Sequence, residues 1–91
     1  MQALAVSVSI DSGKEDEALQ ELRTNIVPRV KESPGLVAAY WMDPERGQGY
    51  AILVYDSEAN AQRAKQMAES APRPDFLKLT TAQVMEVIES L

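Results

Sequence analysis

The order in which two hydrophobic periodicities follow one another constrains this chain more than any other feature of its sequence. Residues 3–10 repeat with period two, and one face comprises Leu4, Val6, Val8 and Ile10. Such alternation is typical of a β-strand. Within residues 19–30 the spacing changes to three and four positions, at Leu19, Leu22, Ile26 and Val30. That spacing is typical of an amphipathic helix, so the chain is expected to begin with a strand followed by a helix.

The limits of this first helix are indicated by capping and helix-breaking residues. Ser12 followed by Glu15 forms a capping-box pattern, in which each side chain binds a free backbone N–H of the first turn. Pro28 lies inside the apolar pattern and has no N–H to donate, so we expect a kink or break near residues 24–27. The sequence Ser33-Pro34-Gly35 then ends the helix, because the residue before a proline avoids the α conformation.

The second half of the chain predicts two strands, a helix and a last strand. Residues 36–42 and 50–55 are strongly apolar, and the turn-forming residues 43–49 between them indicate an antiparallel hairpin. A second helix is expected to follow Ser57 as its N-cap. Its buried side would comprise Ala61, Ala64, Met67 and Ala68. Residues 83–90 are predicted to form an edge strand, although Val84, Val87, Ile88 and Leu91 also fit a helical spacing.

The order βαββαβ predicts a single α+β domain, residues 1–91, with both helices on one face of a four-stranded antiparallel sheet. The other face would be polar in a monomer, yet both predicted hairpin strands are apolar on both faces. In residues 36–42 one face comprises Leu36, Ala38, Tyr40 and Met42, and the other Val37, Ala39 and Trp41. Because soluble monomers rarely expose so large an apolar face, we expect a homodimer that pairs these faces.

The composition excludes several classes of function. Nine basic and fourteen acidic residues give a net charge of −5, so a basic face for nucleic acid or anionic membranes is not expected. The chain has no cysteine and no histidine, which removes the usual transition-metal ligands and nucleophiles. Asp43, Glu45 and Asp56 are expected to have turn and capping roles. We therefore expect a cytoplasmic protein without metal or cofactor and without nucleic-acid or membrane partners.

Four short motifs carry a family resemblance: Val27-Pro28-Arg29, Ser33-Pro34-Gly35-Leu36-Val37, Ala38-Ala39-Tyr40-Trp41 and residues 53–61. With this order of elements, the chain resembles the dimeric α+β barrel superfamily, which includes the antibiotic-biosynthesis monooxygenase-like domains. The resemblance implies two ferredoxin-like protomers that pair their sheets into a barrel, with a ligand cavity between each sheet and its helices. Members include cofactor-independent monooxygenases and haem-degrading enzymes. The latter use a histidine as iron ligand, which this chain lacks.

Polar side chains of the first helix are the first candidates for binding a ligand. Asn25 and Arg29 lie one helical turn apart, and together they would hold an anionic or enolate oxygen. A solvated helix face is the alternative reading of this pair. If the protein is an enzyme, its site is expected between this helix and the sheet. Arg46 and Arg73 are instead expected to be solvated charges in loops.

Aromatic residues of the hairpin strands are the other candidates. Trp41 would stack on a planar molecule, with core or interface packing as the alternative. Tyr40 precedes it directly, and because successive strand residues point to opposite faces, only one of the two can line a cavity. Tyr50 and Tyr55 also fall on opposite faces of their strand, so one is expected at a cavity and the other at the interface.

Two classes of function follow from these candidates, and an interaction domain whose exposed hairpin or acidic helix binds another protein is a third hypothesis. The first is a small dimeric protein that binds an apolar or aromatic molecule, or acts without catalysis. The alternative is a cofactor-independent monooxygenase acting on a quinol- or anthrone-like substrate, where the protein supplies desolvation and orientation. The absence of histidine weighs against the enzyme without excluding it. A cavity lined by polar groups would favour binding or catalysis, and a filled core a structural role.

Overall fold

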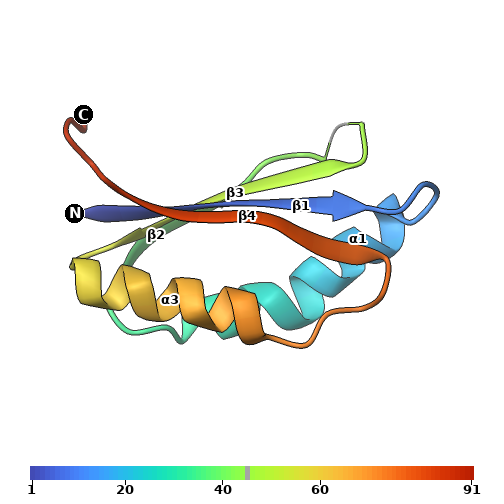
Figure 1. Cartoon of the computed structure of the whole chain (residues 1–91), viewed down its shortest axis with the longest axis horizontal. Coiled ribbons are helices and arrows are strands. Elements are labelled where there is room, and N and C mark those ends of the chain that lie inside the picture. The colour runs from blue at the N-terminus through green and yellow to red at the C-terminus, as the bar shows by residue number, and fades with distance from the viewer. Residues whose placement is uncertain (45) are drawn as a thin grey trace.

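A computed structural model describes residues 1–44 and 46–91, and it has the predicted order of elements (Figure 1). The strands are β1 (Gln2–Ile10), β2 (Leu36–Trp41), β3 (Gln48–Tyr55) and β4 (Leu77–Glu86). The helices are α1 (Glu15–Glu21), the π-helix η1 (Leu22–Ile26), α2 (Val27–Lys31) and α3 (Glu58–Ser70). All neighbouring strands are antiparallel in the order β2-β3-β1-β4. Glu45, in the predicted hairpin turn, lies outside the described residues.

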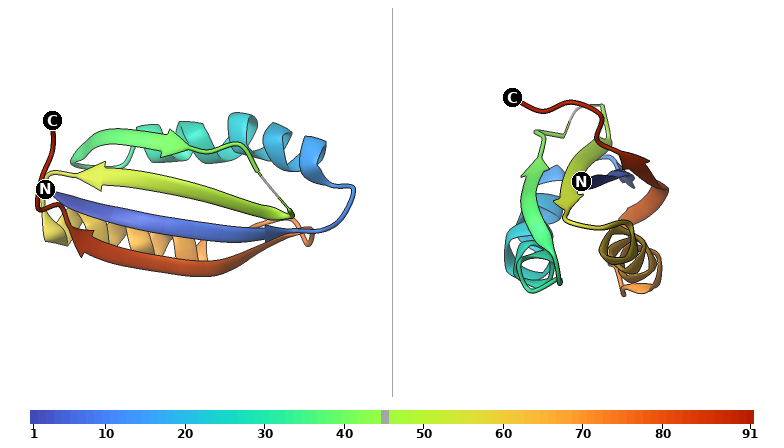
Figure 2. Two further views of the ribbon diagram at one scale, coloured as in Figure 1. Left: turned by 90° about the horizontal axis from the view of Figure 1, so that it is seen from above. Right: turned by 90° about the vertical axis from the view of Figure 1, so that its left-hand side faces the viewer.

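The helices cover one face of the sheet, as the sequence predicts. We call the continuous unit α1–η1–α2, residues 15–31, the helical arm. Seen along the sheet, the arm and α3 lie side by side beneath the same face, the arm toward β2 and α3 toward β4 (Figure 2). Within the described part of the chain, no helix has the length and apolar character needed to cross a membrane.

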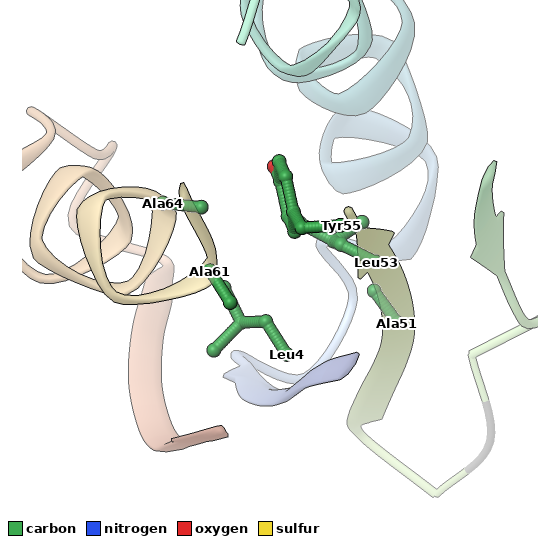
Figure 3. Packing of buried hydrophobic residues seen from close by; sticks show 6 residues of the cluster. All are labelled: Leu4, Ala51, Leu53, Tyr55, Ala61 and Ala64. Carbon is green, nitrogen blue, oxygen red and sulfur yellow. The ribbon is translucent and has the colours of Figure 1, made fainter. Parts of the chain in front are cut away.

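The main core lies between the sheet and α3 (Figure 3). Its buried members are Leu4, Ala51, Leu53, Tyr55, Ala61 and Ala64. The two alanines of α3 are 0% and 6% exposed, and their small side chains let the helix lie close to the strands. Ser57 is the N-cap of α3, and its side chain accepts a hydrogen bond from the backbone N–H of Asn60. The predicted cap and the predicted buried positions 61 and 64 are therefore confirmed.

The helical arm begins later than predicted and is interrupted where a break was expected. The capping-box prediction is wrong: Lys14 is the N-cap, and no side chain caps the helix. A turn closed by the Lys14 N–H to the Asp11 carbonyl, with Gly13 at φ 82°, places Ser12 before the helix rather than at its end. The π-helix η1 stands immediately before Pro28, which occupies the first turn of α2, where its missing N–H costs little.

The last strand occupies different residues from those predicted. The sequence places it at residues 83–90, whereas β4 runs from Leu77 to Glu86 and pairs with the whole of β1. The pairing register shifts between Ser7 and Val8, so that the inward positions Leu77 and Leu79 are out of phase with the later ones at 82 and 84. Because of this β-bulge, the sequence of β4 shows no continuous period-two pattern. The alternative helical reading is also wrong, since residues 87–91 form no helix.

The face of the sheet opposite the helices, here the outer face, is apolar over β2 and β3. By register, this part comprises Ala38, Tyr40, Met42, Tyr50, Ile52 and Val54. Tyr40 is 62% and Tyr50 49% exposed. A register shift between Leu36 and Ala38 corrects two assignments. Leu36 packs toward the core instead of the outer face, and Val37, predicted to share a face with Ala39 and Trp41, is 54% exposed. The predicted apolar outer face is otherwise confirmed.

Candidate functional site

A cavity of about 170 Å³ lies between the helical arm, α3 and the inner face of the sheet. Most of its lining is aliphatic: Val6, Val8, Ile10, Leu19, Leu22, Ile26, Val30, Leu53, Leu77 and Leu79. Protein interiors normally contain few voids larger than a water molecule. An apolar cavity of about 150 Å³ is known to stay dry and to bind benzene. This cavity is therefore large enough for a small aromatic molecule.

The local sequence explains why this space is not filled. On the α3 side the cavity wall includes Ala64, Ala68 and Ala71 beside Met67, and on β3 it includes Gly49 and Ala51. The alanines and the glycine present little or no side chain. On the opposite side the interrupted helical arm contributes larger aliphatic groups. The two helical sides lie apart, and the small side chains of one face the large side chains of the other. The volume between them therefore stays open.

Trp41 and Tyr55 supply the aromatic part of the lining. Trp41 is half-buried on β2 and packs against the main core, which settles that Trp41 rather than Tyr40 faces the helices. Tyr55 extends from β3 into the space between the arm and α3 and is 1% exposed (Figure 3). Its hydroxyl lies 2.9 Å from Ser33 Oγ, which itself lies 2.6 Å from the Val30 carbonyl oxygen.

The direction of this short hydrogen-bond chain follows from its end. A carbonyl oxygen only accepts, so Ser33 donates its single proton to Val30. Ser33 Oγ must then accept from Tyr55, and the Tyr55 O–H is the donor. The phenol is thereby held in one orientation at the edge of the cavity, beneath the end of the helical arm.

Two arginines also line the cavity, one from each helical side. Arg29 lies on α2, is half-buried and lines the cavity between the helical arm and the sheet, where the sequence predicts a site. Arg73 follows α3, is likewise half-buried, and donates from its guanidinium to the Ala68 carbonyl oxygen. The prediction that Arg73 is a solvated loop charge is therefore wrong. Pro72 and Pro74 flank it, and these prolines, which stiffen the connection to β4, are the sequence signal for a fixed side chain.

The other candidate residues lie elsewhere. Asn25 is exposed and donates to Glu21 Oε1 over 2.8 Å, and it does not line the cavity. The wide turn of η1 places Ile26 on the cavity side instead. Tyr40 lies on the outer face. Tyr50 borders the cavity, yet its place between the inward Gly49 and Ala51 directs its side chain to the outer face as well.

Several solved structures share this arrangement of strands and helices over almost the whole length of the chain. The haem-degrading protein MhuD of Mycobacterium tuberculosis, solved with two haems bound, is 16% identical with a TM-score of 0.69, covering 100% of this chain and 99% of the other. A protein of unknown function from Nitrosomonas europaea is 19% identical, with a TM-score of 0.66 over 99% and 91% of the two chains. A dimeric ferredoxin-like protein from an uncultured marine organism is 14% identical, with a TM-score of 0.65 over 100% and 98%.

The chain has the ferredoxin-like fold of these structures. No protein-family model and no curated protein matches its sequence. The similarity to solved structures at these identities concerns the fold alone, and fold does not determine function. The residues of the cavity therefore carry the functional argument for this chain.

Those residues do not fit haem. Haem iron is usually held by histidine, cysteine, methionine or tyrosine, and this chain has neither of the first two. Met67 does line the cavity, so the size of the cavity, rather than the lack of a ligand, argues against haem. The phenol of Tyr55 is buried and committed to Ser33. The cavity is close in size to one that holds a single benzene ring, far smaller than a porphyrin. Among the described residues, no group of three acidic side chains is placed to hold a metal ion.

Proposed function

We propose that this protein binds a small aromatic molecule in the cavity between the sheet and its two helical sides. The observation that carries the proposal is the cavity itself, about 170 Å³ with an almost wholly apolar lining and the indole of Trp41 in its wall. Ligand sites typically combine such an apolar body with a few fixed polar groups. Here Tyr55 and the two arginines supply those groups.

We also propose that the protein acts as a homodimer that pairs the outer faces of two sheets. The support is the apolar surface over β2 and β3, where Tyr40 is 62%, Tyr50 49% and Met42 42% exposed. Contiguous apolar surface of this kind marks an interaction site in soluble proteins. A chain of 91 residues has a small core of its own, so pairing two copies contributes much of the buried apolar area.

The binding proposal is tested by fluorescence, because Trp41 is the only tryptophan of the chain. Single-ring and two-ring aromatic compounds are expected to change its emission saturably and to raise the melting temperature, since a ligand that binds only the folded state stabilises it. In the Ala68→Leu variant the added side chain fills the cavity and is expected to abolish both effects. Ala59→Leu, on the exposed side of α3, is the matched control.

Two results would contradict this proposal. One is that no compound of the series changes the emission of Trp41 or the melting temperature. The other is that the filled variant Ala68→Leu binds as tightly as the control Ala59→Leu, which would place the ligand outside the cavity.

Cofactor-independent oxygenation is a second candidate function, favoured by the presence of Trp41 and Arg29 on one apolar cavity. In such a reaction a substrate carbanion reduces O₂, a substrate CH₂ becomes C=O, and the second oxygen atom leaves as water. Exclusion of water and a cation near the developing enolate would be the contribution of the protein. Oxygen consumption with one- or two-ring analogues of anthrones and quinols, which are of a size to enter the cavity, is expected to fall in Arg29→Ala and Trp41→Phe. A wild-type rate that both variants retain would exclude this site.

A further inference from the structure

Among the residues that the structure describes, the charged side chains that line the cavity are all of one sign. Arg29 and Arg73 line it from opposite helical sides, and none of the described acidic residues does. The chain carries fourteen acidic residues against nine basic ones, so a random distribution would place acids at the cavity more often than bases. In a protein with a net charge of −5, this is a local positive site on an acidic molecule.

From this arrangement we infer that the ligand of the cavity is an aromatic carboxylate, a class of molecule more specific than the aromatic ligand proposed above, on which this inference rests. An anion entering an apolar cavity loses its hydration, which is costly unless charged donors replace the water. Guanidinium groups do so well, because their planar N–H donors match the two oxygens of a carboxylate. The apolar lining then holds the ring while the arginines hold the acid.

The two arginines differ in how firmly they are placed. Arg73 is fixed by its hydrogen bond to the Ala68 carbonyl and by the prolines on either side, which leaves its other N–H donors for a ligand. Arg29 makes no ion pair with the described carboxylates, whose one salt bridge joins Lys14 to Glu17. With no described carboxylate as its partner, the half-buried guanidinium of Arg29 is open to pairing with a bound anion. Arg73 therefore supplies the fixed contact, and Arg29 the side chain that closes on the bound anion.

The experiment compares two ligands of nearly equal shape and different charge. Binding of 4-methylbenzoate and of the neutral 4-methylbenzamide is measured by Trp41 fluorescence and by calorimetry on the full chain at low and moderate ionic strength. The carboxylate is expected to bind at least about tenfold more tightly, because a charge-assisted hydrogen bond contributes more than a neutral one. Added salt is expected to weaken the carboxylate more than the amide.

Variants then assign the preference to the arginines. Arg29→Gln and Arg73→Gln are each expected to lower carboxylate affinity about tenfold or more and to change amide affinity less than twofold. Binding of the amide also shows that each variant is folded with its cavity intact. Arg63→Gln, an exposed residue of α3 that does not line the cavity, is the matched control for a lost positive charge.

The outcomes separate this inference from the function on which it rests. Equal affinity for the two compounds would overturn the carboxylate assignment while leaving aromatic binding in place. A carboxylate preference that survives in the double variant Arg29→Gln/Arg73→Gln would overturn the role of the arginines. Failure of both compounds to bind, with other aromatics also inactive, would refute the proposed function itself.

Discussion

The hydrogen-bond chain from Tyr55 through Ser33 to the Val30 carbonyl allows a test in which two substitutions that delete the same bond have unequal effects. In Tyr55→Phe, the Ser33 hydroxyl keeps its 2.6 Å bond to Val30 and loses only the 2.9 Å bond from the phenol. In Ser33→Ala, the phenol of Tyr55 stays in place without an acceptor, and it is 1% exposed. The two variants therefore differ in whether a buried polar group is left unsatisfied.

The expected costs follow from this difference. Loss of one hydrogen bond with its remaining partner satisfied lowers the free energy of unfolding by about 1 kcal/mol, which is the expectation for Tyr55→Phe. Ser33→Ala loses the bond to Val30 and also leaves the phenol unpaired, a penalty of about 1–3 kcal/mol on its own, so roughly 2–4 kcal/mol is expected in total. Ser33→Ala should thus be at least twice as destabilising as Tyr55→Phe.

The double variant Ser33→Ala/Tyr55→Phe completes the cycle. It removes the unpaired phenol hydroxyl, so it is expected to be as stable as Ser33→Ala or more stable, although it carries one more substitution. Urea denaturation at one fixed protein concentration measures all four proteins, because the stability of a dimer depends on concentration. Additive costs, or a Ser33→Ala variant no less stable than Tyr55→Phe, would refute the proposed direction of the chain and show that the phenol finds another acceptor.

Three further predictions concern the outer face, the turn before β2 and haem. Ile52→Lys places a charge on the outer face and is expected to reduce the mass in light scattering from twice 10.0 kDa to that of one chain. The control Gln62→Lys, on the exposed side of α3, is expected to leave the mass unchanged. A dimeric Ile52→Lys protein would contradict the proposed interface. Gly35→Ala is expected to cost more than the roughly 1–2 kcal/mol of a strained φ, because its Cβ would displace the side chains of Asn60 and Asp56 and break the 2.9 Å hydrogen bond between them. Gly13→Ala, at a similar φ with open space around it, should cost only that amount in urea denaturation, and equal costs would contradict the close contact. Haem titration is expected to give no saturable, stoichiometric Soret shift, because the cavity is too small for a porphyrin. A shift of that kind would show that the cavity opens far enough to admit haem.

The fold was predictable because its signals are local. The alternation of residues 3–10, the N-cap at Ser57 and the break before Pro28 each depend on neighbours in sequence, and each matches the structure. The limits of β4 were not predictable in this way. The bulge of β4 arises from pairing with β1, which lies about seventy residues away in the sequence. No pattern within residues 77–86 indicates this bulge.

The candidate site shows the same division. Strand alternation shows that Trp41 and Tyr40 lie on opposite faces of the sheet, and that Tyr55 and Tyr50 do so as well. Which of the two faces lies against the helices depends on packing. Asn25 was expected beside Arg29 from an ideal helical spacing, and the π-helix removes it from that side. Arg73 lines the same cavity as Arg29 although the two residues are far apart in the sequence, so no local pattern predicts that they come together.

The π-helix η1 also determines how the wall of the cavity can change during evolution. The Val27 N–H bonds to the Leu22 carbonyl five residues back, so this turn holds one residue more than an α-turn. Deleting one residue within Leu22–Ile26 would restore an α-turn and leave α1 facing nearly the same way relative to α2, because the wide turn absorbs the additional residue without turning the helix before it. Leu19 and Ala18 would therefore stay at the cavity. A deletion in a regular α-helical part of the arm would instead rotate every preceding residue by about 100° about the helix axis. A single codon lost within η1 would thus change only one turn of the cavity wall, and the sheet, α3 and both arginines would stay unchanged.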